Sequence, residues 1–173
     1  DAYQVRGSLR WTADSKDLVF TYMSYRKTSD LYVMPASNGI PKQITNHMPA
    51  GLEAFPFVKP ELITYQSRDG LEIPAFVYKP NNSRDVKTPL VIYARANTKG
   101  LHVRGFYPYI QYYLSRGYSV IAPQVRGSAG KGKIYEFLNY GDWGGGDIDD
   151  FAYGAYHLIE QGLANPDKIV MLG

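Results

Sequence analysis

The sequence has no cysteine among its 173 residues, which excludes disulfide bonds and thiolate metal sites. It also lacks any apolar stretch near the ~20 residues that a membrane-spanning helix needs, so we expect no membrane partner. The chain opens at Asp1 without a methionine, a signal peptide or a charged leader. These absences leave the compartment unknown, with the cytoplasm slightly favoured.

No charge of one sign dominates the chain. It carries 19 basic and 16 acidic residues, mixed along its length, for a net charge of +3. Because no run of Lys or Arg forms a basic stripe, we expect no nucleic-acid partner. An apolar content of 45% is ordinary for a chain that builds a core, and the 16 tyrosines favour strand packing over a binding surface.

Residues 1–46 are predicted to be all-β. Polar residues 13–17 form a turn between Trp11 and a strand at 18–22. A second strand at 31–34, a turn at Ser37-Asn38-Gly39 and a third short strand ending at Thr45 follow. This is the spacing of one β-propeller blade, a unit that occurs in arrays because it cannot bury both faces alone. The alternative is a free-standing meander packed on the second half of the chain.

A proline-rich stretch at 47–60 is predicted to be a linker. After this linker, residues 61–173 show a different pattern of apolar and polar residues. A hairpin turns at Arg68-Asp69-Gly70, and "TPLVIY" is a continuous apolar run that predicts a strand buried on both faces.

Two helices are predicted between further strands. The first carries apolar residues at helical spacing from Phe106 to Leu114 and ends at Gly117. The second is capped by Asp147 or Asp149 and ends at Gly162, and its expected apolar face is Ile148, Phe151, Ala152, Ala155, Tyr156 and Ile159. Strands follow the two helices at 118–122 and 168–172, the latter after a turn at Asn165-Pro166-Asp167. This alternation predicts a parallel sheet wound by right-handed crossovers.

"GSAGKGKI" (127–134) nearly fits a nucleotide-binding P-loop. However, Ile134 stands where a hydroxyl must bind Mg²⁺, so the motif's metal role is missing. The glycines of "GDWGGGD" are interpreted as a tight turn, because no strand leads directly into them.

The remaining interpretation is that 61–173 form the sheet of an α/β-hydrolase. In that fold a strand runs into a sharp G-x-S-x-G turn that presents the nucleophilic serine. "KIVMLG" fits the strand and the first glycine, which makes Gly173 the candidate first glycine of the nucleophile elbow. The serine would then be the second residue after it.

The chain resembles the prolyl oligopeptidase family of serine peptidases, especially its acylaminoacyl-peptidase-like and dipeptidyl-peptidase-like members. The residues that carry the likeness lie in family order across the chain: "SRDGLEIPAFVYKP", "RGYSVIAPQVRGSAGKG", "GDWGGGDIDD" and "NPDKIVMLG". The resemblance implies a last propeller blade at 1–46, and the N-terminal half of an α/β-hydrolase domain at 61–173. That half would be a mainly parallel sheet with helices on both faces.

The resemblance also implies a function. The parent protein would hydrolyse short peptides by acyl transfer without a cofactor or metal, and the full-length protein could form a homo-oligomer. Its serine, aspartate and histidine would follow Gly173, so no catalytic residue is expected in this chain, which would be an inactive fragment. By family order, His47, His102 and His157 are therefore not the catalytic base. The alternatives are a catalytically degenerate member with a binding role and an esterase on the same fold.

One stretch departs from the family pattern. Acylaminoacyl-type relatives carry His-Gly-Gly-Pro after the strand at 88–93, and a glycine N–H there contributes to the oxyanion hole. This chain has Arg95-Ala96-Asn97-Thr98. Asn97 could still supply a backbone donor, although glycine enters such turns more readily. In the dipeptidyl-peptidase register, the hydroxyl of Tyr93 would serve the oxyanion instead, unless Tyr93 is only a core residue.

Two further sets of side chains have expected roles. Arg95 is a candidate ligand for a substrate carboxylate, with a surface salt bridge as the alternative. Arg126, Asp142, Trp143 and Asp147 are expected to be scaffold, with a bidentate Arg–carboxylate pair fixing the loops between strands and helices.

Overall fold

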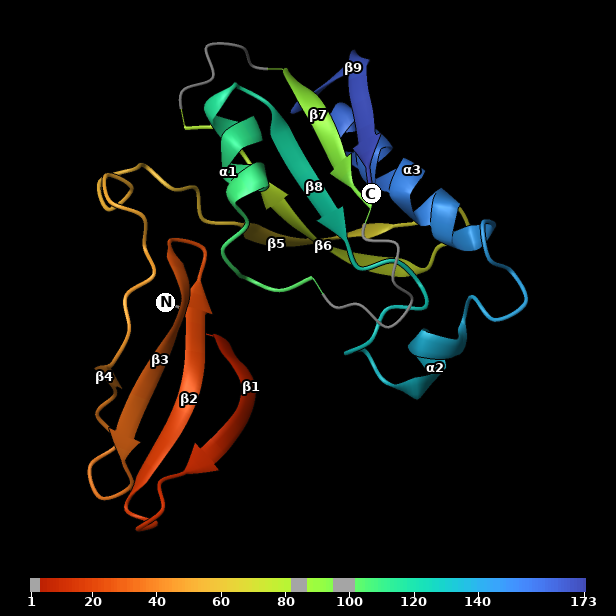
Figure 1. Ribbon diagram of the computed structural model, residues 1–173. Helices are drawn as coiled ribbons and strands as arrows, with labels where there is room; N and C mark the ends of the chain where they lie inside the picture. The colour runs from red at the N-terminus through yellow and green to blue at the C-terminus, as the bar shows by residue number, and fades with distance from the viewer. Residues whose placement is uncertain (1–3, 82–86, 95–101) are drawn as a thin grey trace. The chain divides into compact units, whose positions relative to one another are not determined.

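The computed structural model describes residues 4–81, 87–94 and 102–173 (Figure 1). The chain divides into two compact units. Unit 1 contains Asp1–Lys59 and Val103–Pro108, and unit 2 contains Pro60–His102 and Tyr109–Gly173. The short segment Val103–Pro108 therefore belongs to a different unit from the residues on either side of it.

Unit 1 is a four-stranded antiparallel sheet in the order β1-β2-β3-β4. Its strands are β1 (Gln4–Trp11), β2 (Asp17–Ser24), β3 (Lys27–Pro35) and β4 (Lys42–Gln43). Phe20 on β2 pairs with Tyr32 on β3; both side chains are buried, and their rings stack with centroids 6.0 Å apart. Such cross-strand aromatic pairs explain why these segments form strands.

The third predicted strand, ending at Thr45, is shorter than expected. The ladder between β3 and β4 stops because the backbone N–H of Leu31 donates to the Thr45 hydroxyl (2.9 Å) instead of to a carbonyl. That hydroxyl in turn donates to the buried carboxylate of Asp30 (3.0 Å). A side-chain network thus takes over from the β ladder at this edge.

Unit 2 is a five-stranded mixed sheet in the order β5-β6-β8-β7-β9. Its strands are β5 (Glu61–Gln66), β6 (Glu72–Tyr78), β7 (Thr88–Tyr93), β8 (Ser119–Pro123) and β9 (Ala164–Leu172). Strands β7, β8 and β9 are parallel, whereas β5 with β6 and β6 with β8 are antiparallel. The sheet is therefore mixed rather than mainly parallel, because the predicted hairpin joins the parallel strands through its second strand.

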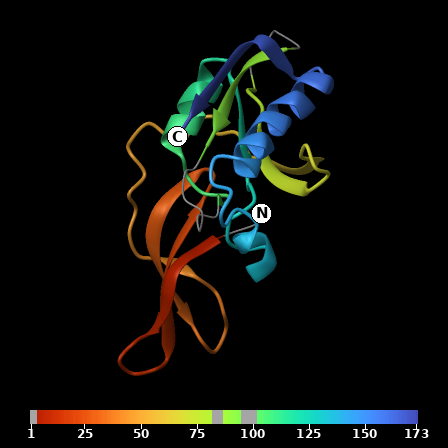
Figure 2. The ribbon, with the colours of Figure 1, turned by 90° about the vertical axis from the view of Figure 1, so that its right-hand side faces the viewer.

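Three helices accompany this sheet: α1 (Pro108–Ser115), α2 (Lys133–Phe137) and α3 (Gly146–Glu160). Figure 2 shows α1 and α3 on opposite faces of the sheet, so the expectation of helices on both faces agrees with the structure. The core between them is built from the apolar side chains of the central strands, among which Leu90 and Ile121 are fully buried. No helix in the described ranges is long and apolar enough to span a bilayer.

The predicted apolar face of α3 was partly wrong. Phe151 and Ala155 are buried as expected, but Ile148 and Tyr156 are 47% and 56% exposed. The helix instead buries Asp150, Gly154 and Leu158. It turns this way because the carboxylate of Asp150 has charged and polar partners inside the protein, described below.

The predicted cap of α3 was also wrong. Gly145 is the N-cap, and it makes no side-chain capping bond. Asp147 and Asp149 lie in the first turn, where their negative charges favour the helix dipole.

The turn predicted at Asn165-Pro166-Asp167 lies inside β9. Thr88 pairs with Ala164, but Leu90 pairs with Ile169, so β9 carries extra residues at this point. The side chain of Asn165 accepts a hydrogen bond from the Asp167 backbone (2.9 Å), which is a local turn within the bulge. The strand resumes beyond it and keeps its pairing with β7 as far as Leu172.

Candidate active site

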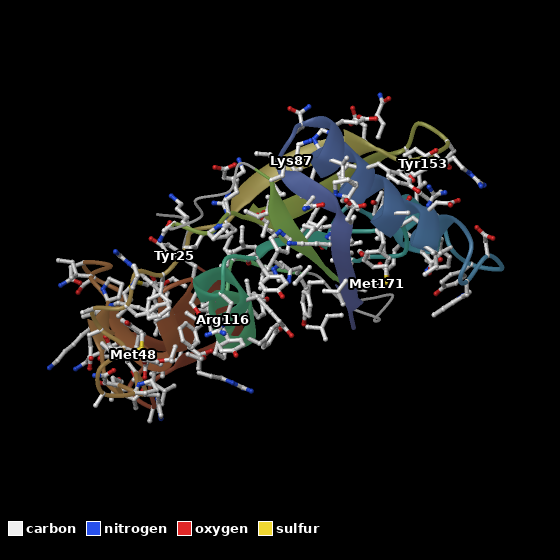
Figure 3. All side chains as sticks on the ribbon, turned by 90° about the horizontal axis from the view of Figure 1, so that it is seen from above. Tyr25, Met48, Lys87, Arg116, Tyr153 and Met171 are labelled. Carbon is white, nitrogen blue, oxygen red and sulfur yellow. The ribbon has the colours of Figure 1, made fainter. Side chains whose placement is uncertain are left out.

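The carboxyl ends of β7 and β9 lie side by side. Tyr93 pairs with Leu172, and the N–H of Ala94 donates to the Leu172 carbonyl (2.8 Å). Figure 1 shows both strands pointing to the same edge, and Figure 3 labels Met171 on β9. In open α/β sheets, ligands bind outside this edge of the parallel strands.

The fold brings two of the predicted site residues together at this edge. Tyr93 ends β7, and Gly173 follows β9 directly. Arg95 and Asn97, the other two, lie outside the described residues. The roles of all four stay predictions.

The geometry explains the glycine at position 173. A Cβ added to Gly173 would overlap the backbone oxygen of Ala94. Backbone cannot move aside as a flexible side chain can, so any larger residue would push β9 away from β7. The position directly after β9 is therefore one that only glycine fits without a shift of the backbone.

The hydroxyl of Tyr93 has a defined partner. Its Oη lies 2.7 Å from the Oη of Tyr109, at the start of α1, and either oxygen can be the donor. The Tyr93 ring also packs edge-on against the ring of His102, with centroids 5.7 Å apart. Tyr93 is thus held from two sides while its side chain stays only partly buried.

His102 is buried in an aromatic setting. Its Nε2 lies 3.0 Å from the Tyr78 hydroxyl, and its ring also packs against Phe76. The backbone of His102 exchanges two hydrogen bonds with the side-chain amide of Gln124, at 3.2 and 2.8 Å. These bonds tie the backbone of His102 to the residue that directly follows β8.

A second cluster lies beyond the carboxyl end of β8 and centres on Arg126. Its guanidinium binds the carboxylate of Asp150 through Nε and Nη2 (2.8–3.2 Å) and that of Asp69 through Nη1 and Nη2 (2.8 and 3.0 Å). Asp150 is fully buried and also accepts hydrogen bonds from the Ser67 hydroxyl (2.6 Å) and the Arg126 backbone N–H (2.8 Å). One arginine therefore ties together the β5–β6 turn, the loop after β8 and the N-terminal half of α3.

The charges of this cluster shift the pKa values of its members. Hydrogen bonding from Arg126 lowers the pKa of Asp69 to about 2, and the two carboxylates raise the pKa of Arg126 above its ordinary value. Burial, aided by the nearby charge of Asp150, raises the pKa of Tyr65 and Tyr135. The arginine and Asp69 are thus charged, and the two tyrosines neutral, throughout the physiological range.

The glycines of "GDWGGGD" serve this cluster. A Cβ on Gly146 would lie 2.7 Å from Nη1 of Arg126, so the guanidinium needs a glycine there to approach the helix. The carboxylate of Asp142 accepts a hydrogen bond from the Gly146 N–H (2.9 Å), and that of Asp147 accepts one from Gly144 (2.9 Å). Side-chain carboxylates therefore occupy the N–H groups that a bound phosphate would use.

The expected bidentate Arg–carboxylate pair is present, but Arg126 binds Asp69 and Asp150, whereas the sequence had grouped it with Asp142 and Asp147. Asp150 stands between Asp149 and Phe151 and looks like one more exposed acid. Its position in the helical repeat could have indicated that it is buried, because it falls on the same helical face as Phe151, Gly154 and Leu158. Across the described ranges, no group of three or more His, Asp or Glu side chains is placed to hold a metal ion.

Comparisons with known proteins show what this chain is similar to. Residues 104–173 match the family described as the prolyl oligopeptidase family. Dipeptidyl aminopeptidase BIII of Pseudoxanthomonas mexicana is 25% identical over 169 residues, which are 94% of this chain and 24% of that protein. The uncharacterized peptidase YuxL of Bacillus subtilis (strain 168) is 26% identical over 146 residues, 83% of this chain and 22% of that protein.

Solved structures share the fold. A puromycin hydrolase superposes with a TM-score of 0.86 at 23% identity, covering 97% of this chain and 26% of that one. The acylaminoacyl peptidase of Pyrococcus horikoshii superposes with a TM-score of 0.83 at 20% identity, covering 99% and 27%. The chain spans about a quarter of the length of the relatives it matches.

Proposed function

Because residues 104–173 match the prolyl oligopeptidase family, we propose that this chain belongs to that family and is part of a serine peptidase that hydrolyses short peptides by acyl transfer. Residues 1–46 would be the last blade of a propeller and 47–60 a linker. Residues 61–173 would be the first half of an α/β-hydrolase domain. Within a longer protein, the nucleophilic serine would be the second residue after Gly173.

The observation that carries this proposal is the shared edge of β7 and β9. A serine held in a sharp turn after Gly173 would stand next to the end of β7, where an oxyanion donor is needed. The close approach of Gly173 to the Ala94 backbone supports such a turn, because it requires the small residue with which the elbow motif begins.

In this reading Tyr93 donates its hydroxyl to the negative oxygen of the tetrahedral intermediate. The partner Tyr109 and the ring of His102 hold the phenol in place before the reaction, so that little reorganisation is needed when charge develops. Asn97 remains the alternative donor through its backbone N–H, and Arg95 the proposed ligand for a substrate carboxylate.

The reaction class is tested by labelling the longer protein with a fluorophosphonate probe. We expect one modified serine, the second residue after Gly173, and no modification of the 173-residue chain alone. Failure to label any serine would leave a binding role on this fold. A labelled protein that cleaves esters but no peptide would be the esterase alternative.

The role of Tyr93 is tested by Tyr93→Phe in the longer protein. We expect kcat to fall by roughly 100-fold, since one oxyanion donor contributes ~3 kcal/mol to the transition state, while KM stays nearly constant. Tyr109→Phe is the matched control: it removes the partner but keeps the hydroxyl of Tyr93, so its loss in kcat should be much smaller.

The opposite result would reassign the oxyanion donor. If Tyr93→Phe leaves kcat unchanged, and replacing residues 95–98 by His-Gly-Gly-Pro raises kcat, Asn97 rather than Tyr93 is the donor. If neither change alters kcat in an active enzyme, the segment from Tyr93 to Thr98 does not form the oxyanion site.

A further inference from the structure

Unit 2 contains a pocket of about 530 Å³ that the proposed reaction does not use. It lies between the outer strand β5 and the C-terminal half of α3, and its size is within the range of small-molecule sites. Because β5 and β9 are the two outer strands of the sheet, three other strands stand between the pocket and β9.

Tyrosine rings form much of the lining. Tyr153 (labelled in Figure 3) and Tyr156 on α3 meet edge to face, with centroids 5.5 Å apart. Tyr65 on β5 is buried, and its ring stacks on that of His157, with centroids 5.9 Å apart. Among the described residues, no Lys or Arg side chain lies over any of these three tyrosine rings. The rings therefore remain available to a cation from outside the protein, which their negative faces attract.

The charge of the lining is negative. Glu160 lines the pocket, and none of the described residues that line it is Lys or Arg. The exposed carboxylate of Glu160 makes no ion pair or hydrogen bond with any described residue. His157 lies three residues before it on the same helix, but the two side chains are not bonded to each other.

The place of Glu160 on its helix adds to this negative charge. Glu160 is the last residue of α3, where the helix dipole contributes a partial negative charge of its own. An acidic side chain at this end of a helix is unfavourable unless a cation lies near it. The chain thus keeps an unbalanced negative potential beside a group of aromatic rings.

Hydrogen-bond acceptors complete the pocket. Thr64 and Gln66 are exposed on β5 and line it from the side of the sheet. Neither side chain has a hydrogen-bond partner among the described residues. Each has an oxygen that can accept a hydrogen bond from an N–H group.

We propose that this pocket binds a small organic ammonium ion. The tyrosine rings contact its carbon atoms and attract its charge, and Glu160 together with the end of α3 balances that charge. An organic anion would meet only negative charge here. The pocket does not suit a metal ion either, because none of the described groups of His, Asp and Glu side chains supplies three ligands. The proposal does not rest on the proposed peptidase function, since its residues lie on β5 and α3 alone.

The test is calorimetric titration of the longer protein with two ammonium ions and their uncharged counterparts. Choline is compared with 3,3-dimethyl-1-butanol, which has the same shape without the charge, and n-butylammonium is compared with 1-butanol. We expect at least one ammonium ion to bind at least about 5-fold more tightly than its counterpart. Its affinity, unlike that of the alcohol, should weaken when salt is raised from low to physiological strength.

Variants locate the site. Glu160→Gln should weaken binding of the ammonium ion by roughly 3- to 10-fold and leave binding of the alcohol unchanged. It should not lower Tm, because it removes a negative charge from the C-terminal end of a helix, and this separates lost binding from lost folding. Tyr156→Leu keeps an apolar side chain at a 56% exposed position but removes the ring, so it should weaken binding of the ammonium ion more than binding of the alcohol.

Glu136→Gln is the matched control. Glu136 is an acid on α2 that does not line the pocket, so the same change of charge there should alter neither affinity.

Three results would overturn the proposal. Equal affinities for each ammonium ion and its alcohol would show that the charge is not recognised. Equal losses in Glu160→Gln and Glu136→Gln would show a general effect of the net charge. Failure of the folded longer protein to bind either ammonium ion would show that the pocket is only a groove filled by solvent or by another part of the protein.

Discussion

Among its described residues, each unit buries one aspartate, but the two carboxylates are held in different ways. Asp150 in unit 2 is 0% exposed and faces the guanidinium of Arg126. Asp30 in unit 1 is 3% exposed, and its closest partner is Nδ1 of His47 (2.7 Å), whose side chain is 67% exposed. The remaining donors to Asp30 are hydroxyls, an amide and a backbone N–H.

The two carboxylates differ in how they respond to the loss of one partner. The partner of Asp150 is an arginine, which keeps its charge at any pH that proteins meet, and both groups lie inside the protein. Several individually modest hydrogen bonds hold Asp30, so the loss of any one leaves the others. The buried charge of Asp150 in unit 2 is thus balanced by one cation, Arg126, whereas unit 1 distributes the hydrogen bonds to Asp30 over a segment of chain.

The largest effect should come from Arg126→Gln. It would leave Asp150 buried without its cation, and breaking a buried pair in this way costs about 3–5 kcal/mol of unfolding free energy. Hydrogen exchange should show lost protection across 119–160, while β2 and β3 keep theirs. The stability of Arg126→Lys should lie between that of the native chain and that of Arg126→Gln, because an ammonium keeps the charge but cannot make the bidentate bonds.

A second substitution keeps this prediction testable if Arg126→Gln fails to fold. Adding Asp150→Asn to Arg126→Gln removes the buried charge, so the double variant should be more stable than Arg126→Gln alone. If the double variant is less stable than the single one, the two side chains are not coupled as the structure indicates.

A smaller effect is expected from Asp30→Asn, about 1–3 kcal/mol, because the amide replaces one acceptor oxygen among several hydrogen bonds. The rate of amide hydrogen exchange in Asp30→Asn should rise near β3, β4 and His47, and it should not rise in unit 2. Equal losses of protection in both units would contradict the separation of the two networks.

The Asp30 effect should also depend on pH. Burial raises the pKa of Asp30, but hydrogen bonds from His47, Thr45 and Thr28 outweigh it, and the net pKa lies below the ordinary value of 3.8. A carboxyl group whose pKa is lower when folded stabilises the fold above its unfolded pKa, and this is lost as pH falls through the folded value. The stability difference between the native chain and Asp30→Asn should therefore shrink on acidification from pH ~5 to ~2 in denaturant titrations.

The smallest effect should come from Asp69→Asn. Asp69 shares Arg126 with Asp150, but its side chain is 53% exposed, so solvent screens the pair and its contribution should stay below ~1 kcal/mol. Because its pKa is lowered to about 2, this contribution should disappear between pH ~4 and ~2. A loss as large as that of Arg126→Gln would mean that Asp69, and not Asp150, is the principal partner.

Local patterns allowed much of the fold to be predicted. The hairpin turn at Arg68-Asp69-Gly70, the buried strand "TPLVIY" and the positions of α1 and α3 follow from periodicity and turn chemistry. The antiparallel pairing of β6 with β8 could not be predicted in this way. It depends on which distant strands become neighbours, and residue spacing within each strand does not encode that.

The same distinction applies to the candidate site. Gly173 could be chosen from the apolar run before it and Tyr93 from the family resemblance, but their closeness depends on the pairing of β9 with β7, strands that are far apart in the chain. Asp150 was missed for a related reason. Its burial is possible only because Arg126 and Ser67 arrive from other elements to meet it.

The assignment of Val103–Pro108 to unit 1 has a consequence for how the protein is made. A ribosome releases residues in order, and domains usually fold as they emerge. Unit 1 cannot be completed when Lys59 emerges, because its last segment follows β5, β6 and β7 of unit 2. The contacts of Val103–Pro108 with the rest of unit 1 can form only after residue 108 has emerged, when β5, β6 and β7 have also been synthesised, so a synonymous-codon pause placed after residue 108 should favour correct folding more than one placed after residue 59.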